Sequence, residues 1–220
     1  MKRTKLCDRV LPHYCKGEEI MNMVTHIVGG GLALLGGCLL LWKAQGFLPI
    51  LVATVYITAM VGVYTMSSIY HGLRTGTGKK VMQVIDHCAI YFLIAGTYTP
   101  ILLCTFVPVY PLIGWGLLIL QWALAALAVT LTAIDLKKYK VFSMICYIVM
   151  GWSIACFLPQ TLEVMTRPGF YWLLAGGIAY TIGAVLFGLG KKLPWMHAVF
   201  HIFVILGSAL QYVAILGYVY

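Results

Sequence analysis

Seven apolar runs, each close to the length that crosses a membrane as a helix, occupy most of this 220-residue sequence. A transmembrane helix needs about 20 predominantly apolar residues. Short connections that contain Lys, Arg, Pro or Gly separate the runs. The expected spans are 24–41, 48–70, 85–105, 112–134, 141–158, 170–188 and 196–218. The pattern predicts an all-α integral membrane protein with one domain over residues 1–220, a single bundle of seven transmembrane helices.

The composition agrees with a lipid environment. Charged residues make up 10% of the chain and hydrophobic residues 62%, whereas soluble domains carry roughly 25% charged residues. A small globule in water needs more polar surface than this chain can supply. The net charge of +9 could suggest nucleic acid, but no basic stripe interleaved with aromatic residues lies in a polar segment. We therefore exclude nucleic acid and expect membrane lipids as partners.

Neither the N-terminal segment nor the cysteines suggest secretion. Residues 1–19 are polar and basic and lack the apolar core of about 7–15 residues that a signal peptide needs. We expect no cleavage there, so the first apolar helix should be a membrane anchor. The seven cysteines are scattered without a C-x-x-C pair. This pattern is typical of small apolar fillers rather than of a disulfide framework or a thiolate zinc site.

The distribution of positive charge predicts the orientation. Thirteen of the fifteen Lys and Arg residues fall in the N-terminal segment and in the connections after the second, fourth and sixth spans. Only Lys43 and Arg167 fall on the opposite side. Because Lys and Arg concentrate in cytoplasmic loops, we expect the N-terminus in the cytoplasm and the C-terminus outside. An even number of spans would break this alternation.

With that topology, five of the six histidines come to one depth near the cytoplasmic face. They are His26, His71, His87, His197 and His201. The sixth, His13, lies in the N-terminal segment. An acidic residue, Asp86, lies at the same depth, and it is the only one close to the interior of a predicted span. This convergence makes the cytoplasmic end of the bundle the candidate functional site.

The spacing of three histidines predicts a zinc site. His197 and His201 are four residues apart, which puts both on one face of a helix. His71, at the cytoplasmic end of the second span, can supply a third nitrogen. Three protein ligands with a water in the fourth position are typical of catalytic zinc. Asp86 would orient that water or take its proton, and an intramembrane carboxylate needs such a partner. The alternative is a hydrogen-bonded or pH-sensing histidine cluster.

The neighbouring polar residues allow more than one interpretation. Ser67 lies four residues before His71, so its hydroxyl either bonds back to a backbone carbonyl or steadies the water or the oxyanion. We expect His13 and His87 to be interfacial or hydrogen-bonded. His87 follows Asp86 and points about 100° away from it, so both should not face one centre.

Residues near the start of the first span are expected to play local roles. His26 either makes a structural hydrogen bond or supports the site. Glu19 and Asn22 are most simply helix-capping residues, with Glu19 favouring the positive end of the helix.

Four motifs in this order resemble the bacterial hemolysin III family, the prokaryotic branch of the progestin and adiponectin receptor group. The resemblance runs from about Glu18 to the C-terminus, without a departure at the ligand positions. The motifs are Glu19-x-x-Asn22-x-x-Thr25-His26-x-x-Gly29, Ser67-x-x-Tyr70-His71, Asp86-His87-x-Ala89-Ile90-Tyr91-x-x-Ile94-Ala95-Gly96-Thr97-Tyr98-Thr99-Pro100 and His197-x-x-x-His201.

The resemblance implies a seven-helix bundle in the bacterial plasma membrane with zinc near the cytoplasmic side. His71, His197 and His201 match its ligand positions, and Asp86 and Ser67 match residues close to the metal-bound water. It also implies a relationship to transmembrane alkaline ceramidases, and a link with membrane homeostasis.

Three functions follow as hypotheses. The first is a zinc-dependent hydrolase of a lipid amide, with Asp86 as general base and then acid. The second is a non-catalytic sensor of membrane state in which zinc locks helices together. The third, cytolysis, is implied by the family name, but the helices are hydrophobic all round and offer no ring of charge to line a pore.

Overall fold

The computed structural model describes residues 4–6, 8–189 and 193–220, and within these ranges the chain is helical with no β-strand. Four of the basic residues and one of the cysteines considered above lie outside the described ranges: Lys2, Arg3, Lys191, Lys192 and Cys7. In chain order the elements are α1 (Lys16–Lys43), α2 (Phe47–Gly72), α3 (Thr77–Ile101), the π-helical turn η1 (Leu102–Phe106), α4 (Val107–Val109), α5 (Pro111–Ile134), α6 (Lys140–Trp152), the 3₁₀ turn η2 (Ser153–Phe157), α7 (Leu158–Leu189) and α8 (Met196–Tyr218).

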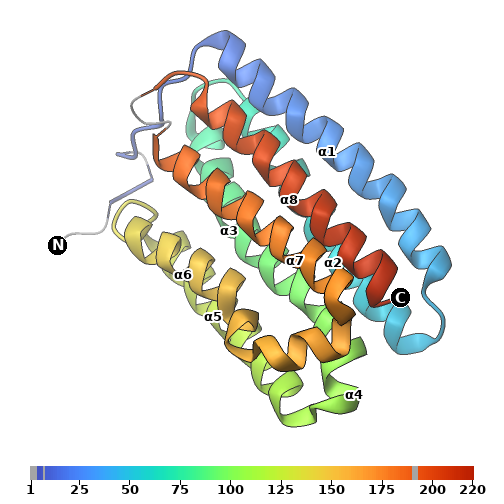
Figure 1. Ribbon diagram of the computed structural model, residues 1–220. Helices are drawn as coiled ribbons and strands as arrows, with labels where there is room; N and C mark the ends of the chain where they lie inside the picture. Colours follow the sequence, from blue (N-terminus) through green and yellow to red (C-terminus); the bar gives the residue numbers. More distant parts are fainter. Residues whose placement is uncertain (1–3, 7, 190–192) are drawn as a thin grey trace.

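Six helical stretches in the described residues are long and apolar enough to cross a membrane. The fifth and sixth predicted spans both lie in one of them, the 50-residue stretch Lys140–Leu189. Its backbone leaves the helical region at Thr166, where φ is 60° and ψ is 164°. Figure 1 shows that the chain runs one way along α6 and returns in the opposite direction along most of α7.

The connection expected at residues 159–169 is largely helical. Its two prolines suggested helix breakers, but each of them sits where a helix tolerates proline. Pro159 is the second residue of α7, and Pro168 follows the break at Thr166 by two residues. Proline is accepted in the first turn of a helix because the amide that it lacks would have no intrahelical partner there.

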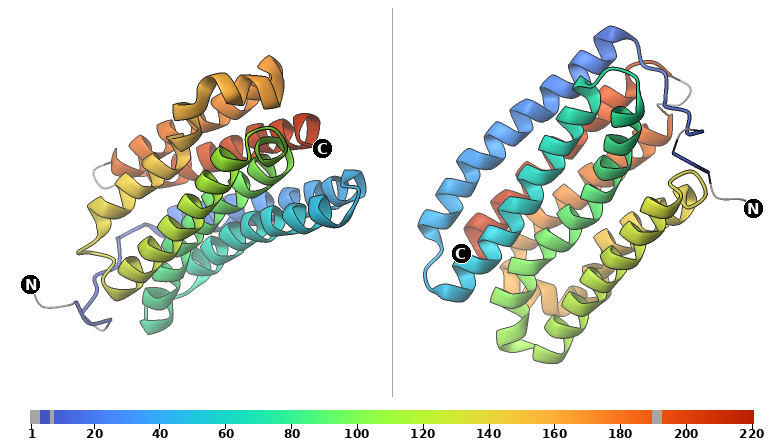
Figure 2. Two further views of the ribbon diagram at one scale, coloured as in Figure 1. Left: turned by 90° about the horizontal axis from the view of Figure 1, so that it is seen from below. Right: turned by 180° about the vertical axis from the view of Figure 1, so that it is seen from behind.

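Helix α3 forms the centre of the bundle. Within the protein, 61% of its apolar window is buried, against 33% or less for the other five stretches. Figure 1 shows α8 between α1 and α7, with α5 and α6 at the far side from α1. From behind, α2 lies between α1 and α3 (Figure 2). The remaining apolar surface of the outer helices faces outward, as expected for helices in contact with lipid.

Small residues bring pairs of helices close together. A Cβ atom added at Gly96 of α3 would lie 2.6 Å from the Ala59 Cβ of α2. One added at Gly176 of α7 would lie 2.4 Å from the Gln211 side chain and 3.0 Å from the Gly207 carbonyl oxygen of α8. At Gly96 and Gly176 the absence of a side chain therefore permits close packing of neighbouring helices.

One end of the bundle gathers the starts of α1, α3, α6 and α8 and the C-terminal ends of α2, α5 and α7, and we call it the amino end (Figure 1). The segment before α1 crosses this end. The Thr4 backbone amide donates to the Asp135 carboxylate (2.7 Å), and the Arg9 guanidinium donates to the Ala133 carbonyl (3.5 Å). This segment therefore ties the start of α1 to the α5–α6 turn.

Candidate metal centre

Three histidines converge at the amino end, as the sequence predicted. His71 comes from the last turn of α2, and His197 and His201 come from the first turns of α8. The Nε2 atom of His197 lies 3.3 Å from Nε2 of His71 and 3.2 Å from Nε2 of His201. All three residues are buried, and their ligand atoms lie within 4.8 Å of one another, a grouping that could hold a metal ion.

The outer nitrogens of two of these rings already have acceptors. The Nδ1 atom of His71 lies 2.7 Å from a Glu19 carboxylate oxygen, and Nδ1 of His201 lies 3.1 Å from the Asn22 carbonyl oxygen. Because carboxylates and carbonyls accept hydrogen bonds, these contacts assign the proton of each ring to Nδ1. The Nε2 lone pairs of His71 and His201 then face the centre of the cluster. A single N–H group of His197 cannot donate a hydrogen bond to both of these lone pairs.

This donor set fits a divalent metal with imidazole ligands. Zinc–nitrogen bonds are about 2.0–2.1 Å long, so tetrahedral coordination places two donor atoms about 3.3 Å apart. The two Nε2–Nε2 distances given above, 3.3 Å and 3.2 Å, agree with that spacing. Two of the three distances between donor atoms therefore match imidazole ligands of one zinc ion, and all the ligand atoms lie within 4.8 Å of one another.

Asp86 and Ser67 lie beside the histidines rather than among them. Asp86 is on α3 and Ser67 is one turn before His71 on α2. The two side chains hydrogen-bond to each other, and both line the cavity that His197 and His201 also line. The Asp86 side chain keeps 14% of its surface exposed. Its carboxylate is therefore accessible to a molecule bound in the cavity.

The structure revises the expectation for His87. Its Nδ1 atom is 2.8 Å from the Gln83 carbonyl oxygen, so it is hydrogen-bonded as predicted. It nevertheless lines the same cavity as Asp86, and its Nδ1 atom lies 3.6 Å from the Asp86 carboxylate. The 100° offset between consecutive residues was a poor guide, because a cavity on this scale spans more than one face of α3. His13 is exposed in the N-terminal segment.

His26 packs against the cluster but is not part of it. Its ring stacks on His201, with 3.7 Å between the ring centres and 11° between the planes. It is 3% exposed, and neither ring nitrogen has a hydrogen-bond partner among the described residues. Of the two roles considered for His26, this placement favours support of the site through packing.

Glu19 lies in the first turn of α1, as expected for an acidic residue at the positive end of a helix, but neither Glu19 nor Asn22 is a capping residue. The N-cap residue is Cys15, and Glu18 completes the capping box with it. Glu19 instead turns inward and contacts both His71 (2.7 Å) and the Lys79 ammonium (2.6 Å). A signal was present in the sequence, because Glu19, Asn22 and His26 are spaced three and four residues apart and so share one helix face.

Residues before α1 and α8 cover the cluster at the amino end. The ring of Tyr14 stacks on His197, with 5.0 Å between centres and 25° between planes, and lies 5.9 Å from the ring of His71. Burial, and then the nearby carboxylates, raise the pKa of Tyr14. The backbone amide of Trp195, which has a left-handed φ of 67°, donates to Glu18 (2.6 Å). This contact joins the start of α8 to α1.

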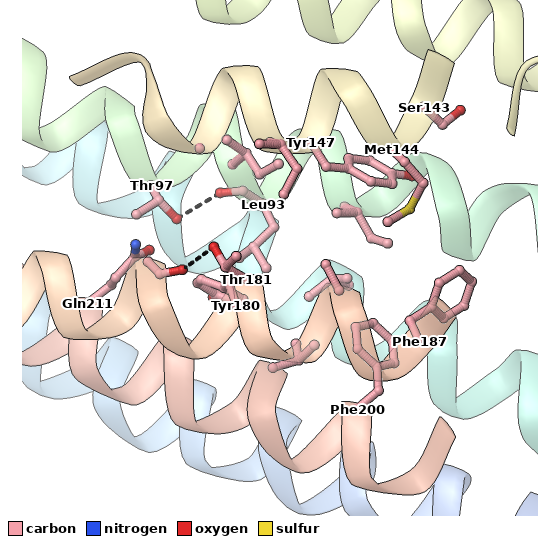
Figure 3. Close-up of a pocket in the computed structure, with 18 of the residues that line it drawn as sticks. Leu93, Thr97, Ser143, Met144, Tyr147, Tyr180, Thr181, Phe187, Phe200 and Gln211 are labelled. Carbon is pink, nitrogen blue, oxygen red and sulfur yellow. Dashed lines mark hydrogen bonds between the residues drawn. The ribbon is translucent and has the colours of Figure 1, made fainter. Parts of the chain in front are cut away.

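A cavity of about 180 Å³ extends from the histidines into the bundle between α3, α6, α7 and α8. Figure 3 shows Met144 and Tyr147 of α6 on one side and Phe187 and Phe200 on the other. Its imidazoles and the Asp86 carboxylate lie at the histidine end, Thr97, Thr181 and Gln211 line it farther into the bundle, and most of the remaining wall is apolar. Gly177 of α7 lines it, and nothing lies within 4 Å of a Cβ atom added there. The cavity can accept an apolar chain next to the polar cluster.

A helical bundle whose described residues include six stretches long and apolar enough to cross a membrane, with a buried three-histidine cluster at one end, defines a multi-pass membrane protein with a candidate metal centre. The family model described as "Haemolysin-III related" matches residues 14–212. The chain belongs to this family, as its motifs indicated, and is a multi-pass protein of the bacterial plasma membrane.

Individual relatives cover nearly the whole chain. The sequence is 40% identical over 205 residues to Hemolysin-3 of Bacillus cereus, which covers 92% of each protein. It is 33% identical over 204 residues to the Hemolysin-3 homolog of Bacillus subtilis (strain 168), which covers 91% of this chain and 94% of the relative. It is also 28% identical over 211 residues to the human monocyte to macrophage differentiation factor, and the match covers 92% of this chain and 85% of the relative.

Proposed function

We propose that this protein is a zinc-dependent hydrolase that acts on a lipid amide, with His71, His197 and His201 as the metal ligands. The observation that carries the proposal is the position of the cluster. His197, His201, Asp86 and Ser67 line one end of a cavity whose other walls are mostly apolar, and His71 completes the histidine cluster beside that end. A lipid amide would match such a site, because it joins a polar reacting group to a long apolar acyl chain.

The proposal includes seven membrane crossings with the amino end in the cytoplasm. The stretch Lys140–Leu189 would cross twice, because 50 residues far exceed one crossing and the chain reverses direction near Thr166. Most described Lys and Arg residues belong to the amino end, whereas Lys43 and Arg167 belong to the other end. The positive-inside rule then favours a cytoplasmic amino end.

When bound, zinc supplies a Lewis acid for the amide carbonyl and lowers the pKa of a water to about 7. Asp86 removes a proton from the attacking water and later gives it to the amine as the carbon–nitrogen bond breaks. The products are a fatty acid and an amine. Ser67 holds the Asp86 carboxylate through their hydrogen bond. The apolar walls hold the acyl chain and exclude other water.

The test uses purified zinc-loaded protein in detergent and a series of fluorogenic lipid amides with different acyl lengths. We expect release of the amine by the wild type. Asp86→Asn should reduce the rate by at least about 100-fold, in the range of general acid–base catalysis, while it keeps its zinc. Ser67→Ala should reduce it less. Glu163→Gln, which removes a carboxylate that hydrogen-bonds Tyr110 rather than a residue of the cavity, is the matched control.

Failure of zinc-loaded wild type to hydrolyse any amide in the series would contradict the hydrolase. The second candidate, a non-catalytic sensor of membrane state, would then explain the site. One observation favours it: the ligands come from α2 and α8, and both helices are held by α1 at the same point. A metal there would join α2 to α8 directly, and α1 would be linked to it only through its contacts with His71 and His201. For such a protein, loss of a ligand histidine would lower the thermal stability, and Asp86→Asn would not.

A further inference from the structure

Among the described residues, Glu19 makes the shortest polar contact to any of the three clustered histidines. One carboxylate oxygen lies 2.7 Å from Nδ1 of His71, on the side of the ring away from the other two histidines. The second oxygen lies 2.6 Å from the Lys79 ammonium. The Glu19 side chain is 21% exposed, whereas those of His71 and Lys79 are 0% and 5% exposed. The carboxylate is therefore shared between a buried imidazole and a buried cation.

Lys79 is itself fixed. Its ammonium also contacts the carbonyl oxygens of His71 (3.4 Å) and Leu73 (3.1 Å), where α2 ends. A cation is favourable at the C-terminus of a helix because the last carbonyls lack intrahelical partners. Lys79 thus holds α3 and α2 together and leaves the Glu19 carboxylate little freedom to turn away. Lys79 falls in the connection expected between the second and third spans, but it lies in the first turn of α3.

Asn22 completes the same face of α1. Its carbonyl oxygen accepts from Nδ1 of His201 (3.1 Å), and its side-chain nitrogen lies 3.5 Å from Nδ1 of His71. Helix α1 therefore contacts two of the clustered rings at the nitrogen that does not face the cluster. It supplies no member of the cluster itself.

We propose that Glu19 is a positioning residue for the metal ligand His71, and that Lys79 anchors it. The carboxylate accepts the Nδ1 proton, so the ring keeps the tautomer whose Nε2 lone pair faces the site. It also makes the ring a stronger donor, and its negative charge offsets part of the charge of a divalent cation held by neutral imidazoles. This inference rests on the proposed metal binding, which it deepens by assigning a residue outside the ligand set.

The effect should appear in metal affinity rather than in folding. Loss of a partner of a ligating histidine typically lowers metal affinity by about 10- to 100-fold. We expect Glu19→Ala near the upper end of that range. Glu19→Gln should lie near the lower end, because the amide oxygen still accepts a hydrogen bond but carries no charge. Lys79→Met, which leaves the carboxylate but frees it to rotate, should have a smaller effect.

The experiment titrates metal-free protein in detergent with Co²⁺ against a competing chelator and records the visible absorption of the bound ion. Wild type, Glu19→Gln, Glu19→Ala and Lys79→Met are compared, with Glu163→Gln as a carboxylate control at another place in the bundle. The thermal midpoint of each metal-free variant is measured in parallel. Glu19→Gln retains the shape of the side chain and serves if Glu19→Ala does not fold.

A raised dissociation constant and an altered cobalt spectrum in both Glu19 variants, with Glu163→Gln like wild type, would support the proposal. Wild-type affinity and spectrum in the Glu19 variants would overturn it and leave the metal site intact. Absence of cobalt binding in folded wild type would overturn the metal site itself, and the role of Glu19 with it. The two failures are therefore distinguishable.

Discussion

The ring of Tyr14 stacks on the imidazole of His197, with 5.0 Å between the ring centres and 25° between their planes. Tyr14 belongs to the segment that crosses the amino end, and it also lies 5.9 Å from the ring of His71. It therefore covers two of the three clustered histidines where the bundle ends.

We expect Tyr14→Ala to speed the loss of bound metal to a chelator by roughly 3- to 10-fold, because an aromatic pair of this kind contributes about 0.5–1.5 kcal/mol. Tyr14→Phe should behave like wild type, since the stacking ring remains. Tyr171→Ala, at a tyrosine of α7 that is 60% exposed, controls for loss of an aromatic side chain. Equal release rates for Tyr14→Ala and wild type would show that Tyr14 does not cover the site.

Two adjacent glycines of α7 should respond oppositely to the same substitution. A Cβ atom at Gly176 would lie 3.0 Å from the Gly207 carbonyl oxygen of α8, whereas nothing lies within 4 Å of one at Gly177. Gly176→Ala should destabilise the protein by about 1–3 kcal/mol through overpacking. Gly177→Ala should be neutral or stabilise by up to about 1 kcal/mol, because alanine favours the helix. Thermal unfolding in detergent compares the two, and equal midpoints would contradict the close approach of α7 and α8.

Asp135 should give the N-terminal segment a contribution to stability that depends on pH. The backbone amide of Thr4, and then that of Lys138, donate to its carboxylate and lower its pKa from 3.8 to about 2. Because the pKa is lower in the folded state, the contribution is present above about pH 4 and is lost as the pH falls through about 2. Asp135→Asn should therefore lower the thermal midpoint at about pH 6 and make a smaller difference at about pH 2. A pH-independent difference would mean that the charge of Asp135 does not hold the segment.

The sequence was sufficient for the all-helical membrane fold and for the gathering of the histidines. Both follow from simple geometry: apolar runs of membrane length become helices, and helices that alternate in direction bring Ser67, His71, Asp86 and His197 to one depth. The spacing of His197 and His201 then required a shared face. These features can be predicted without knowledge of how each helix is rotated about its own axis.

The sequence did not predict how each helix is rotated about its own axis. This rotation decides that Glu19 faces His71 rather than the start of its own helix, and that His87 reaches the cavity beside Asp86. It depends on close packing at small residues such as Gly96 and Gly176, which a single sequence marks only as glycines. A connection over residues 159–169 was expected, but not that most of it is helical around a break at Thr166, because its prolines sit in positions that helices accept.

The central claim is that His71, His197 and His201 bind zinc, and metal analysis by mass spectrometry tests it most directly. The protein would be purified in detergent without added metal, beside His71→Ala and the double variant His197→Ala/His201→Ala. We predict about one zinc per chain in the wild type, as for a mononuclear site of this kind, and none in either variant. Well-folded wild type without zinc, or variants that retain it, would contradict the account.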